Sequence, residues 1–286
     1  MTPSVKQSSP AAPQLSLQGA GLGLRRSLLS DLLEQQPDTI DFVEVAPENW
    51  INVGGRYGAG FREALQHYPL ACHGLSLSIG SPAPLDTDYL QQLKVFFDLH
   101  QPVLYSEHLS YCSDDGHLYD LMPIPFTGEA VRYVAARIRQ VQDAIERPLV
   151  IENVSYYAAP GQEMTELEFL NAVLTEADCQ LLLDINNIYV NSINHRYSAT
   201  EFMHGVPAAR VAYFHVAGHY VEAEDLRIDT HAAPVCDPVW ELLDQAYAHF
   251  GPRPTLLERD FNIPPLDELL AEVGQIRRLQ APYASA

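Results

Sequence analysis

The chain has few cysteines, and none of them is paired with a neighbour. Its 286 residues include four, at positions 72, 112, 179 and 236, and no two of them form a CxxC pair. A zinc knuckle or a disulfide framework needs clustered or regularly spaced cysteines, so the sequence indicates neither. We expect each thiol to be a small buried hydrophobic group rather than a ligand.

Long apolar segments are also missing. No apolar run reaches the length of a membrane span, so neither a transmembrane helix nor a membrane partner is predicted. Residues 1–14 are rich in Ser, Pro and Ala and lack the apolar stretch of a signal peptide. We therefore expect residues 1–14 to form a disordered tail and the protein to be cytoplasmic.

Basic residues are scarce. The chain has 17 Lys and Arg against 37 Asp and Glu, which gives a formal net charge of −20. A strongly acidic surface repels a phosphate backbone, so no nucleic-acid partner is expected. Carboxylates that bind metal cations would also contribute to this high number of acidic residues.

What the chain does contain is a regular alternation of β-rich and helical segments over residues 15–286, which we take as one domain. Eight runs rich in Val, Ile, Leu and Tyr have the composition of buried parallel strands. They cover residues 15–24, 39–45, 70–79, 103–111, 149–155, 180–185, 211–216 and 255–259. Amphipathic stretches between them include residues 88–100, 127–145, 166–176 and 238–250, with Thr127 and Asp237 as predicted N-caps.

Eight β/α units in a chain of this length predict an α/β fold, a single (β/α)8 TIM barrel. A doubly wound parallel sheet is the alternative. Gly19, Gly21 and Gly23 do not have the spacing of a GxGxxG dinucleotide motif, so they do not favour that alternative.

Chemically active side chains recur at the ends of the predicted strands. In a barrel of this kind, the active site lies at the carboxyl ends of the strands and in the loops that follow. Consecutive strands end in His, Asp or Glu after an apolar run, and such side chains are costly to bury unless they are paired or bound to metal. A single histidine of this type would more often be structural, but the whole set predicts a metal centre at one mouth. The set comprises Glu44, His73, His108, Glu152, Asp184, His215 and Glu258, with Asp229 and His231 in the loop after the seventh strand.

The residue types restrict the metal. Imidazoles and carboxylates without clustered thiolates suit Zn, Fe or Mn and disfavour Cu(I) and iron–sulfur clusters. The set has more donors than one ion needs, so we expect two or three ions with open positions for water, oxygen or substrate.

Two further acidic residues, Glu107 and Asp260, lie beside predicted ligands in the sequence. If the strands remain extended there, side chains alternate between the two faces, and both are then predicted to point away from the ligands. We expect them to form structural ion pairs, with Arg259 as one candidate partner.

Nine motifs, one for almost every strand, resemble the multinuclear non-haem iron-dependent oxidative enzymes, a family long known only as a domain of unknown function. The likeness runs from Gly19 to Pro264, and the family is similar in fold to the xylose-isomerase-like barrels. One departure is Ala232, where a glycine is expected. The motifs are GLGLR, EVAPENW, HGLSLSIGS, SEHLS, ENVSYY, LLDINNIYVN, HVAGH, DTHAAPV and LLERDFNIP.

The resemblance implies a ligand set. Trinuclear zinc endonucleases share the barrel, and they have a histidine where this chain has Asn187. Asn187 is typical of the iron family, and its hard amide oxygen suits iron better than a third zinc. The implied metal is two or three iron ions in a mixed Fe(II)/Fe(III) state. The implied ligands are His73, His108, Glu152, Asp184, Asn187, His215, Asp229, His231 and Glu258.

The resemblance also implies a reaction. Members of the family oxidise cysteine residues of ribosomally made precursor peptides with O2 as co-substrate, and they commonly work with a second protein that binds the leader of the peptide. We expect catalytic roles for Glu152, as a carboxylate bridging two ions, and for His215. His219 is expected to support the ligands or to contact substrate.

Three other functions stay open at this point. The first is a metal-dependent hydrolase of the endonuclease type, which the acidic charge and Asn187 disfavour. The second is a sugar isomerase, which usually employs a barrel lysine, whereas the only lysines here are Lys6 and Lys94, away from the strand ends. The third is a barrel that binds metal without catalysis.

Overall fold

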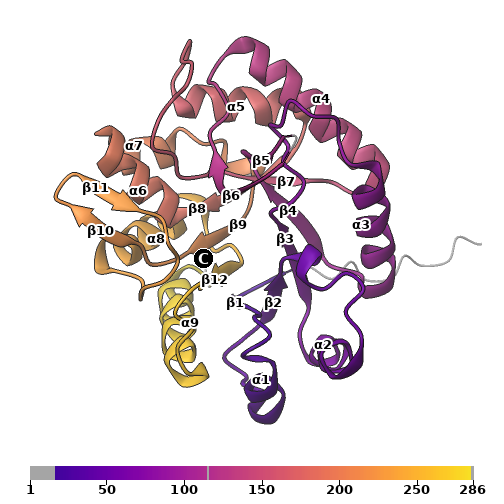
Figure 1. The fold of residues 1–286 in the computed structure, drawn as a ribbon. Helices are drawn as coiled ribbons and strands as arrows, with labels where there is room; N and C mark the ends of the chain where they lie inside the picture. The colour runs from indigo at the N-terminus through magenta and orange to yellow at the C-terminus, as the bar shows by residue number, and fades with distance from the viewer. Residues whose placement is uncertain (1–16, 115, 285–286) are drawn as a thin grey trace, which may run out of the picture.

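The computed structural model describes residues 17–114 and 116–284, and these form a closed barrel of eight parallel strands surrounded by helices (Figure 1). The strands follow one another around the barrel in the order β1-β12-β9-β8-β7-β4-β3-β2. The predicted (β/α)8 barrel is confirmed. The barrel strands are β1 Ala20–Gly23, β2 Phe42–Val45, β3 Leu70–Gly74, β4 Leu104–His108, β7 Val150–Glu152, β8 Gln180–Asp184, β9 Val211–Val216 and β12 Thr255–Leu257.

Every barrel strand lies within a run that the sequence predicts, because parallel strands buried on both faces need continuous apolar segments. Seven of the eight observed strands are shorter than the predicted runs, and β9 has the predicted bounds. The third run extends to residue 79, but the chain turns after Gly74, and the sixth run ends early because Ile185 already begins a helix. Residues 15 and 16 of the first run, and the predicted tail 1–14, lie outside the described residues.

The helices pack their apolar faces against the outside of the barrel and bury one large hydrophobic core with it. Thr127 caps its helix as predicted, since its hydroxyl accepts a hydrogen bond from the N–H of Ala130 at 3.2 Å. The helices are α1 Leu29–Gln35, α2 Gly55–His67, α3 Thr87–His100, α4 Gly128–Ile145, α5 Glu166–Ala177, α6 Ile185–His195, α7 Ala199–His204, α8 Asp237–Phe250 and α9 Leu266–Gln280, with 3-10 turns η1 Pro47–Asn49, η2 Ala208–Arg210 and η3 Ala281–Tyr283.

The prediction that Asp237 caps α8 is wrong. Cys236 occupies the cap with extended backbone, and Asp237 is the first residue inside the helix. Pro238 fits this arrangement because a proline in the first turn has no N–H that needs a partner. Asp237 still places a negative charge at the positive end of the helix.

Two small hairpins, absent from the sequence prediction, are inserted after barrel strands. β5 (Tyr111–Ser113) pairs with β6 (His117–Met122) in the loop after β4, and β10 (Tyr220–Ala223) pairs with β11 (Leu226–Ile228) after β9. Both insertions therefore lie on the side of the barrel where the strands end. None of the described helices is long and apolar enough to cross a membrane.

Candidate metal centre

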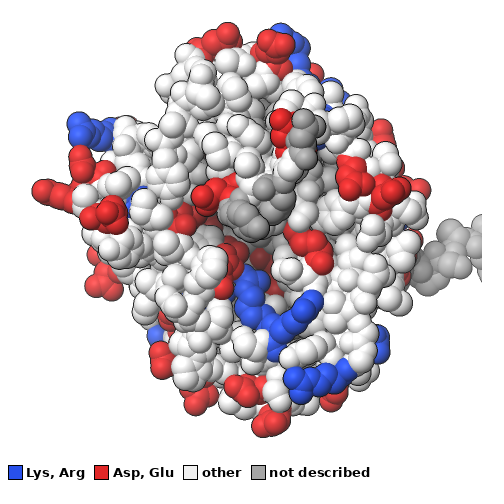
Figure 2. Space-filling view, in the orientation of Figure 1, with Lys and Arg blue, Asp and Glu red and all other residues white. Residues whose placement is uncertain are grey.

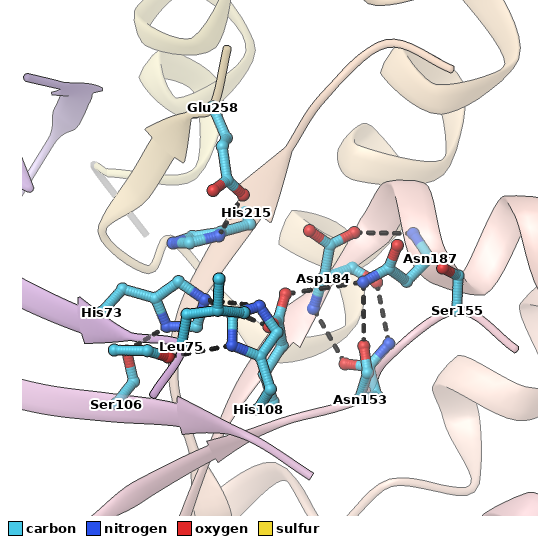
Figure 3. A network of polar contacts seen from close by, with 12 residues as sticks. His73, Leu75, Ser106, His108, Asn153, Ser155, Asp184, Asn187, His215 and Glu258 are labelled. Carbon is cyan, nitrogen blue, oxygen red and sulfur yellow. Dashed lines mark hydrogen bonds and ion pairs between the residues drawn. The ribbon is translucent and has the colours of Figure 1, made fainter. Parts of the chain in front are cut away.

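The carboxyl ends of the strands open into one cavity of about 450 Å³. Asp184 and His215, although not in its lining, are fully buried and approach the lining residues Asn187 and Glu258 (Figure 3). The barrel thus brings all nine predicted ligands to one place. Those in the lining are His73, His108, Glu152, Asn187, Asp229, His231 and Glu258.

The first group of donors comes from the ends of β3, β4 and β7. The Nε2 atoms of His73 and His108 lie 3.2 Å apart, and they are 3.2 and 3.1 Å from Glu152 Oε2. His73 Nδ1 contacts Ser106 Oγ at 2.8 Å, and His108 Nδ1 contacts the carbonyl of Gly74 at 2.9 Å. These outer contacts fix both imidazole rings so that Nε2 faces the carboxylate.

A second group joins β8, β9 and the end of β12. Single donor atoms of Asp184, His215 and Glu258 all lie within 4.8 Å of one another. His215 Nδ1 is 3.1 Å from Glu258 Oε2, while its Nε2 lies 3.0 Å from Glu44 Oε1. The Tyr213 hydroxyl donates to Glu44 Oε2 at 2.9 Å, so a buried carboxylate orients the ring of His215 from behind.

The third group stands nearer the rim of the cavity. His231 Nδ1 lies 3.3 Å from Glu258 Oε2 and 3.1 Å from Asp260 Oδ2, and His231 Nε2 lies 2.8 Å from Asp229 Oδ1. Arg25 pairs with Asp260 and approaches Glu258 at 3.8 Å. Since Glu258 belongs to both the second and the third group, it joins two neighbouring sets of donors.

Asn187 is held in place by the start of α6. The N–H of Asn187 donates to Asp184 Oδ1 at 2.6 Å, which caps the helix. Asn187 Nδ2 donates to the carbonyl of Asn153 at 3.1 Å, while its Oδ1 makes no hydrogen bond with any described residue. The amide oxygen therefore remains available to a cation.

Five buried polar atoms of these residues form no hydrogen bond of good geometry within the described part of the chain, although Glu152 Oε2, His215 Nε2 and His231 Nε2 make the ion-pair contacts given above. A buried polar atom normally finds a partner, so each exception needs an explanation. Two ligand atoms about 2.1 Å from one ion and at right angles lie about 3.0 Å apart, which matches the spacings above. The residues present therefore fit more than one metal ion. The atoms are Glu152 Oε2, Asp184 Oδ2, Asn187 Oδ1, His215 Nε2 and His231 Nε2.

The carboxylates of the site favour the charged form of the neighbouring histidines, and the histidines favour the charged form of the carboxylates. Burial lowers the pKa of His73, but the Glu152 carboxylate outweighs burial and raises that pKa to about 9. Burial raises the pKa of Glu152, whereas His108 and His73 bring it down to about 2. Glu44 and Glu258 likewise raise the pKa of His215 against the effect of burial. A cation that binds here must displace imidazole protons, so its affinity depends on pH.

His219 is separated from the predicted ligand Asp229 by one intervening side chain, that of Asn186. Its Nδ1 lies 2.8 Å from Asn186 Oδ1, and Asn186 Nδ2 donates to Asp229 Oδ1 at 2.9 Å. Asp229 also accepts a hydrogen bond from the Ser155 hydroxyl at 2.9 Å. His219 therefore reaches Asp229 through one amide, and it is not among the residues that line the cavity.

The prediction that Asp260 points away from the ligands is wrong. β12 ends at Leu257, so the alternation of an extended strand no longer applies three residues later, and Asp260 turns into the cavity. Arg259 pairs instead with Glu272 at 2.7 Å.

Glu107 does point away from His108, because β4 is still extended there. The predicted ion pair is wrong, because among the described residues Glu107 accepts hydrogen bonds from the Tyr105 hydroxyl at 2.7 Å and the N–H of Leu77 at 3.3 Å. Ala232 keeps a negative φ without the expected glycine, and the left-handed residue of that loop is His231, at φ 48°.

Sequence reasoning counted Glu44 among the strand-end residues of the centre but did not name it as a ligand, and it assigned no role to Asn186, Asn153 and Arg25. The signal for Glu44 was present, since a carboxylate closes an otherwise apolar strand. The other three act through hydrogen bonds across loops that periodicity does not reveal.

The fold and the donor set define a TIM-barrel protein with a candidate centre for several metal ions. The chain belongs to the family of RiPP precursor modification enzymes MbnB/TglH/ChrH, whose pattern matches residues 19–281. RiPPs are ribosomally synthesised and post-translationally modified peptides, so a precursor peptide is the substrate that the family implies. The resemblance carried by the nine sequence motifs is thereby confirmed.

Curated relatives carry only a family label. A UPF0276 protein of Shewanella amazonensis is 63% identical over 262 residues, covering 92% of this chain and 94% of the relative. A UPF0276 protein of Pseudomonas aeruginosa strain PAO1 is 58% identical over 262 residues, with 92% of each chain covered.

Solved structures share the barrel at low sequence identity. The 3-keto-D-glucoside 4-epimerase of E. coli superposes with a TM-score of 0.60 at 12% identity, covering 91% of this chain and 99% of the epimerase. Endonuclease IV of Thermus thermophilus gives 0.59 at 14% identity, covering 92% of this chain and 99% of the endonuclease. These likenesses support the xylose-isomerase-like fold alone.

Proposed function

We propose that this protein is an iron- and O2-dependent enzyme that oxidises cysteine residues of a ribosomally made precursor peptide. The observation that carries the proposal is the convergence of three overlapping donor groups on one cavity, in a chain of a peptide-modifying family. The proposed ligands are those named from the sequence, with Glu258 shared between neighbouring ions. When bound, iron supplies the redox chemistry with O2 that side chains lack.

The donor chemistry favours iron over zinc. The set combines imidazoles, carboxylates and one amide oxygen, that of Asn187, and contains no thiolate. Hard oxygen donors in such number suit iron in changing oxidation states better than a closed tetrahedral zinc site.

The substrate thiol would enter from the cavity side. A volume of about 450 Å³ accommodates a cysteine with parts of its neighbours. A four-electron oxidation removes four hydrogens from the peptide while one O2 is reduced to two waters. In this scheme Glu152 and His215 hold the reacting centre, and His219 positions Asp229 through Asn186.

The test uses the precursor peptide together with its leader-binding partner protein. Incubated with the iron-loaded enzyme and O2, the peptide should lose about 4 Da at cysteine, because the cysteine thiolate would anchor the peptide at the centre. A peptide with Cys→Ser should stay unmodified. Unchanged turnover of the serine peptide would remove cysteine from the mechanism.

Asn187→His separates the proposal from a hydrolytic alternative. It recreates the endonuclease-like donor set, so we expect the variant to bind metal but to lose oxidation of the peptide. Cleavage of abasic DNA by the unmodified protein without O2 would instead establish the hydrolase.

A further inference from the structure

A cluster of arginines stands beside the cavity in a chain with a net charge of −20. Figure 2 shows basic side chains gathered near the centre of the face shown, over β1, β2 and the start of α2, next to acidic ones. Arg25, at the inner end, is occupied by Asp260 and Glu258. Arg26 and Arg56 lie further out, and both side chains are exposed.

Arg26 and Arg56 are arranged around one aromatic ring. The guanidinium of Arg56 lies 4.7 Å from the centroid of Tyr57 and donates to its hydroxyl at 2.9 Å. The guanidinium of Arg26 lies 6.0 Å from the same ring and 5.6 Å from that of Trp50. We call Arg26, Arg56 and Tyr57 the arginine strip.

The arginine strip borders the cavity directly. Arg26 donates a hydrogen bond to the carbonyl of Asn49, and Asn49 belongs to the cavity lining together with His73. A chain held on the strip would therefore lie next to the metal centre.

The arginine strip has N–H donors that remain available to a ligand. Within residues 17–114 and 116–284, neither Arg26 nor Arg56 has a carboxylate within 4.0 Å. A guanidinium resting on an aromatic ring keeps its N–H groups free at the edge, where they match a carboxylate in a bidentate pair.

We propose that the arginine strip binds acidic residues flanking the cysteine of the precursor peptide and so guides that cysteine into the cavity. The inference rests on the proposed function, which names the peptide as substrate. Because exposed charges act over about 8 Å at physiological salt, the strip attracts a local carboxylate although the whole chain is acidic. A long phosphate backbone is disfavoured, since it would also meet the surrounding negative charge.

The experiment compares two synthetic fluorescein-labelled peptides, Asp-Asp-Gly-Gly-Cys-Gly-Gly-Asp-Asp and the same sequence with Asn for every Asp. Affinity for the iron-loaded protein is measured under argon by fluorescence anisotropy at low and high salt. We expect the Asp peptide to bind about tenfold more tightly, the scale of one charge-assisted contact, and to lose this advantage in high salt. Equal affinity, or no binding of either peptide up to about 1 mM, would overturn the proposal.

Two double variants test whether the preference for the Asp peptide comes from the arginine strip. R26Q/R56Q should bind the two peptides equally, while R132Q/R278Q, with the same change of charge at exposed arginines on α4 and α9, should keep the preference. Loss of the preference in both double variants would mean that net charge, not the strip, selects the peptide. Iron content and thermal unfolding are compared first, so that a folding defect is recognised, and R56Q alone provides a milder substitution.

Two experimental outcomes distinguish the inference about the arginine strip from the proposed function on which it rests. If the Asp peptide binds through the strip but the precursor peptide, incubated with its partner protein and O2, keeps its mass, the strip stands and cysteine oxidation fails. If single-stranded oligothymidine displaces the Asp peptide at equal concentration, the strip is a phosphate site and the inference is wrong.

Discussion

At the scale of single residues, the candidate centre depends on side chains that serve two groups of donors. Glu258 Oε2 lies 3.1 Å from His215 Nδ1 and 3.3 Å from His231 Nδ1, so one carboxylate faces both histidines. His231 and His215 also hold the pKa of Glu258 well below its usual range, against the effect of burial. We therefore propose that Glu258, in addition to the Glu152 expected from the sequence, is shared between neighbouring ions.

Glu258→Gln tests this point. A neutral amide is a weaker ligand than a carboxylate, so we expect the variant to retain about one iron fewer per chain than the wild type after anaerobic reconstitution. Elemental analysis gives the stoichiometry. Glu268→Gln, at an exposed position of α9, is the matched control. An unchanged iron content in the Glu258 variant would contradict the shared role.

Residue patterns in the sequence predicted the site well where the chain is regular. His73, His108 and Glu152 close barrel strands, and the strand direction alone brings them together. Asp260 was misplaced because it lies beyond the end of β12, where the alternation rule has no basis. Asn186 reaches Asp229 across 43 residues, and no local pattern encodes such a contact.

At the scale of elements, one buried arginine ties a helix to a loop of the site. Arg137 on α4 donates to the carbonyls of Ile79 and Ala83 at 2.7 and 2.8 Å. These carbonyls belong to the connection between β3 and α3, which begins directly after His73 and Gly74. The charged side chain replaces the hydrogen bonds that the irregular backbone cannot make with itself.

Arg137→Gln should lower the free energy of unfolding by about 3 kcal/mol, because two charge-assisted hydrogen bonds to the backbone are lost. Urea unfolding of the variant gives the value. Arg139→Gln, on the exposed face of the same helix, should change stability by less than about 0.5 kcal/mol. Equal effects of the two substitutions would show that the loop does not depend on the Arg137 contacts.

A second, half-buried acidic group joins α5 to α6. Glu166 accepts hydrogen bonds from Asn191 Nδ2 and the Tyr197 hydroxyl, each at 3.1 Å. Burial raises the pKa of Glu166 to about 7, although these hydrogen bonds oppose the rise. The folded state therefore holds a proton that the unfolded state releases near its ordinary pKa of about 4.5.

The sign of the effect follows from this difference. Between about pH 4.5 and pH 7 the folded chain binds more protons at Glu166, so its contribution to stability falls as pH rises through that window. Glu166→Gln should remove the dependence, and between pH 5 and pH 8 it should gain about 2–3 kcal/mol relative to the wild type. Urea unfolding at both pH values measures this gain. Parallel pH profiles for the two proteins would contradict the assignment.

The sequence predicted buried helices and strands better than exposed ones. The barrel strands stand out as apolar runs, whereas every residue of β10 is exposed and carries no apolar alternation. Hairpins of this kind are held by the loops around them, so a local pattern could not reveal them.

At the scale of the whole molecule, the donors draw on most of the barrel. Six of the nine come from β3, β4, β7, β8 and β9 and from the residue that follows β12, and the others lie on α6 and in the segment after β11. Bound ions would cross-link strands that lie far apart in the sequence, and a ligand that binds only the folded state stabilises it.

Removing the metal should therefore lower the melting temperature. For the iron-loaded protein we expect a chelator to reduce Tm by on the order of 5 °C or more. Differential scanning calorimetry under argon measures the shift, and Glu258→Gln should show a smaller one. An identical Tm with and without chelator would mean that the ions, if bound, add nothing to the fold.

Asp184 places a limit on evolutionary drift. One of its oxygens caps α6 by accepting from the N–H of Asn187, and the other faces the donor groups and makes no hydrogen bond within residues 17–114 and 116–284. Histidine would offer a metal a good ligand but would leave the first turn of the helix without its acceptor, and serine would do the reverse. Many core residues of this chain can be exchanged for others of similar size during evolution. At Asp184 almost every substitution would lose either the helix cap or the oxygen that faces the donor groups.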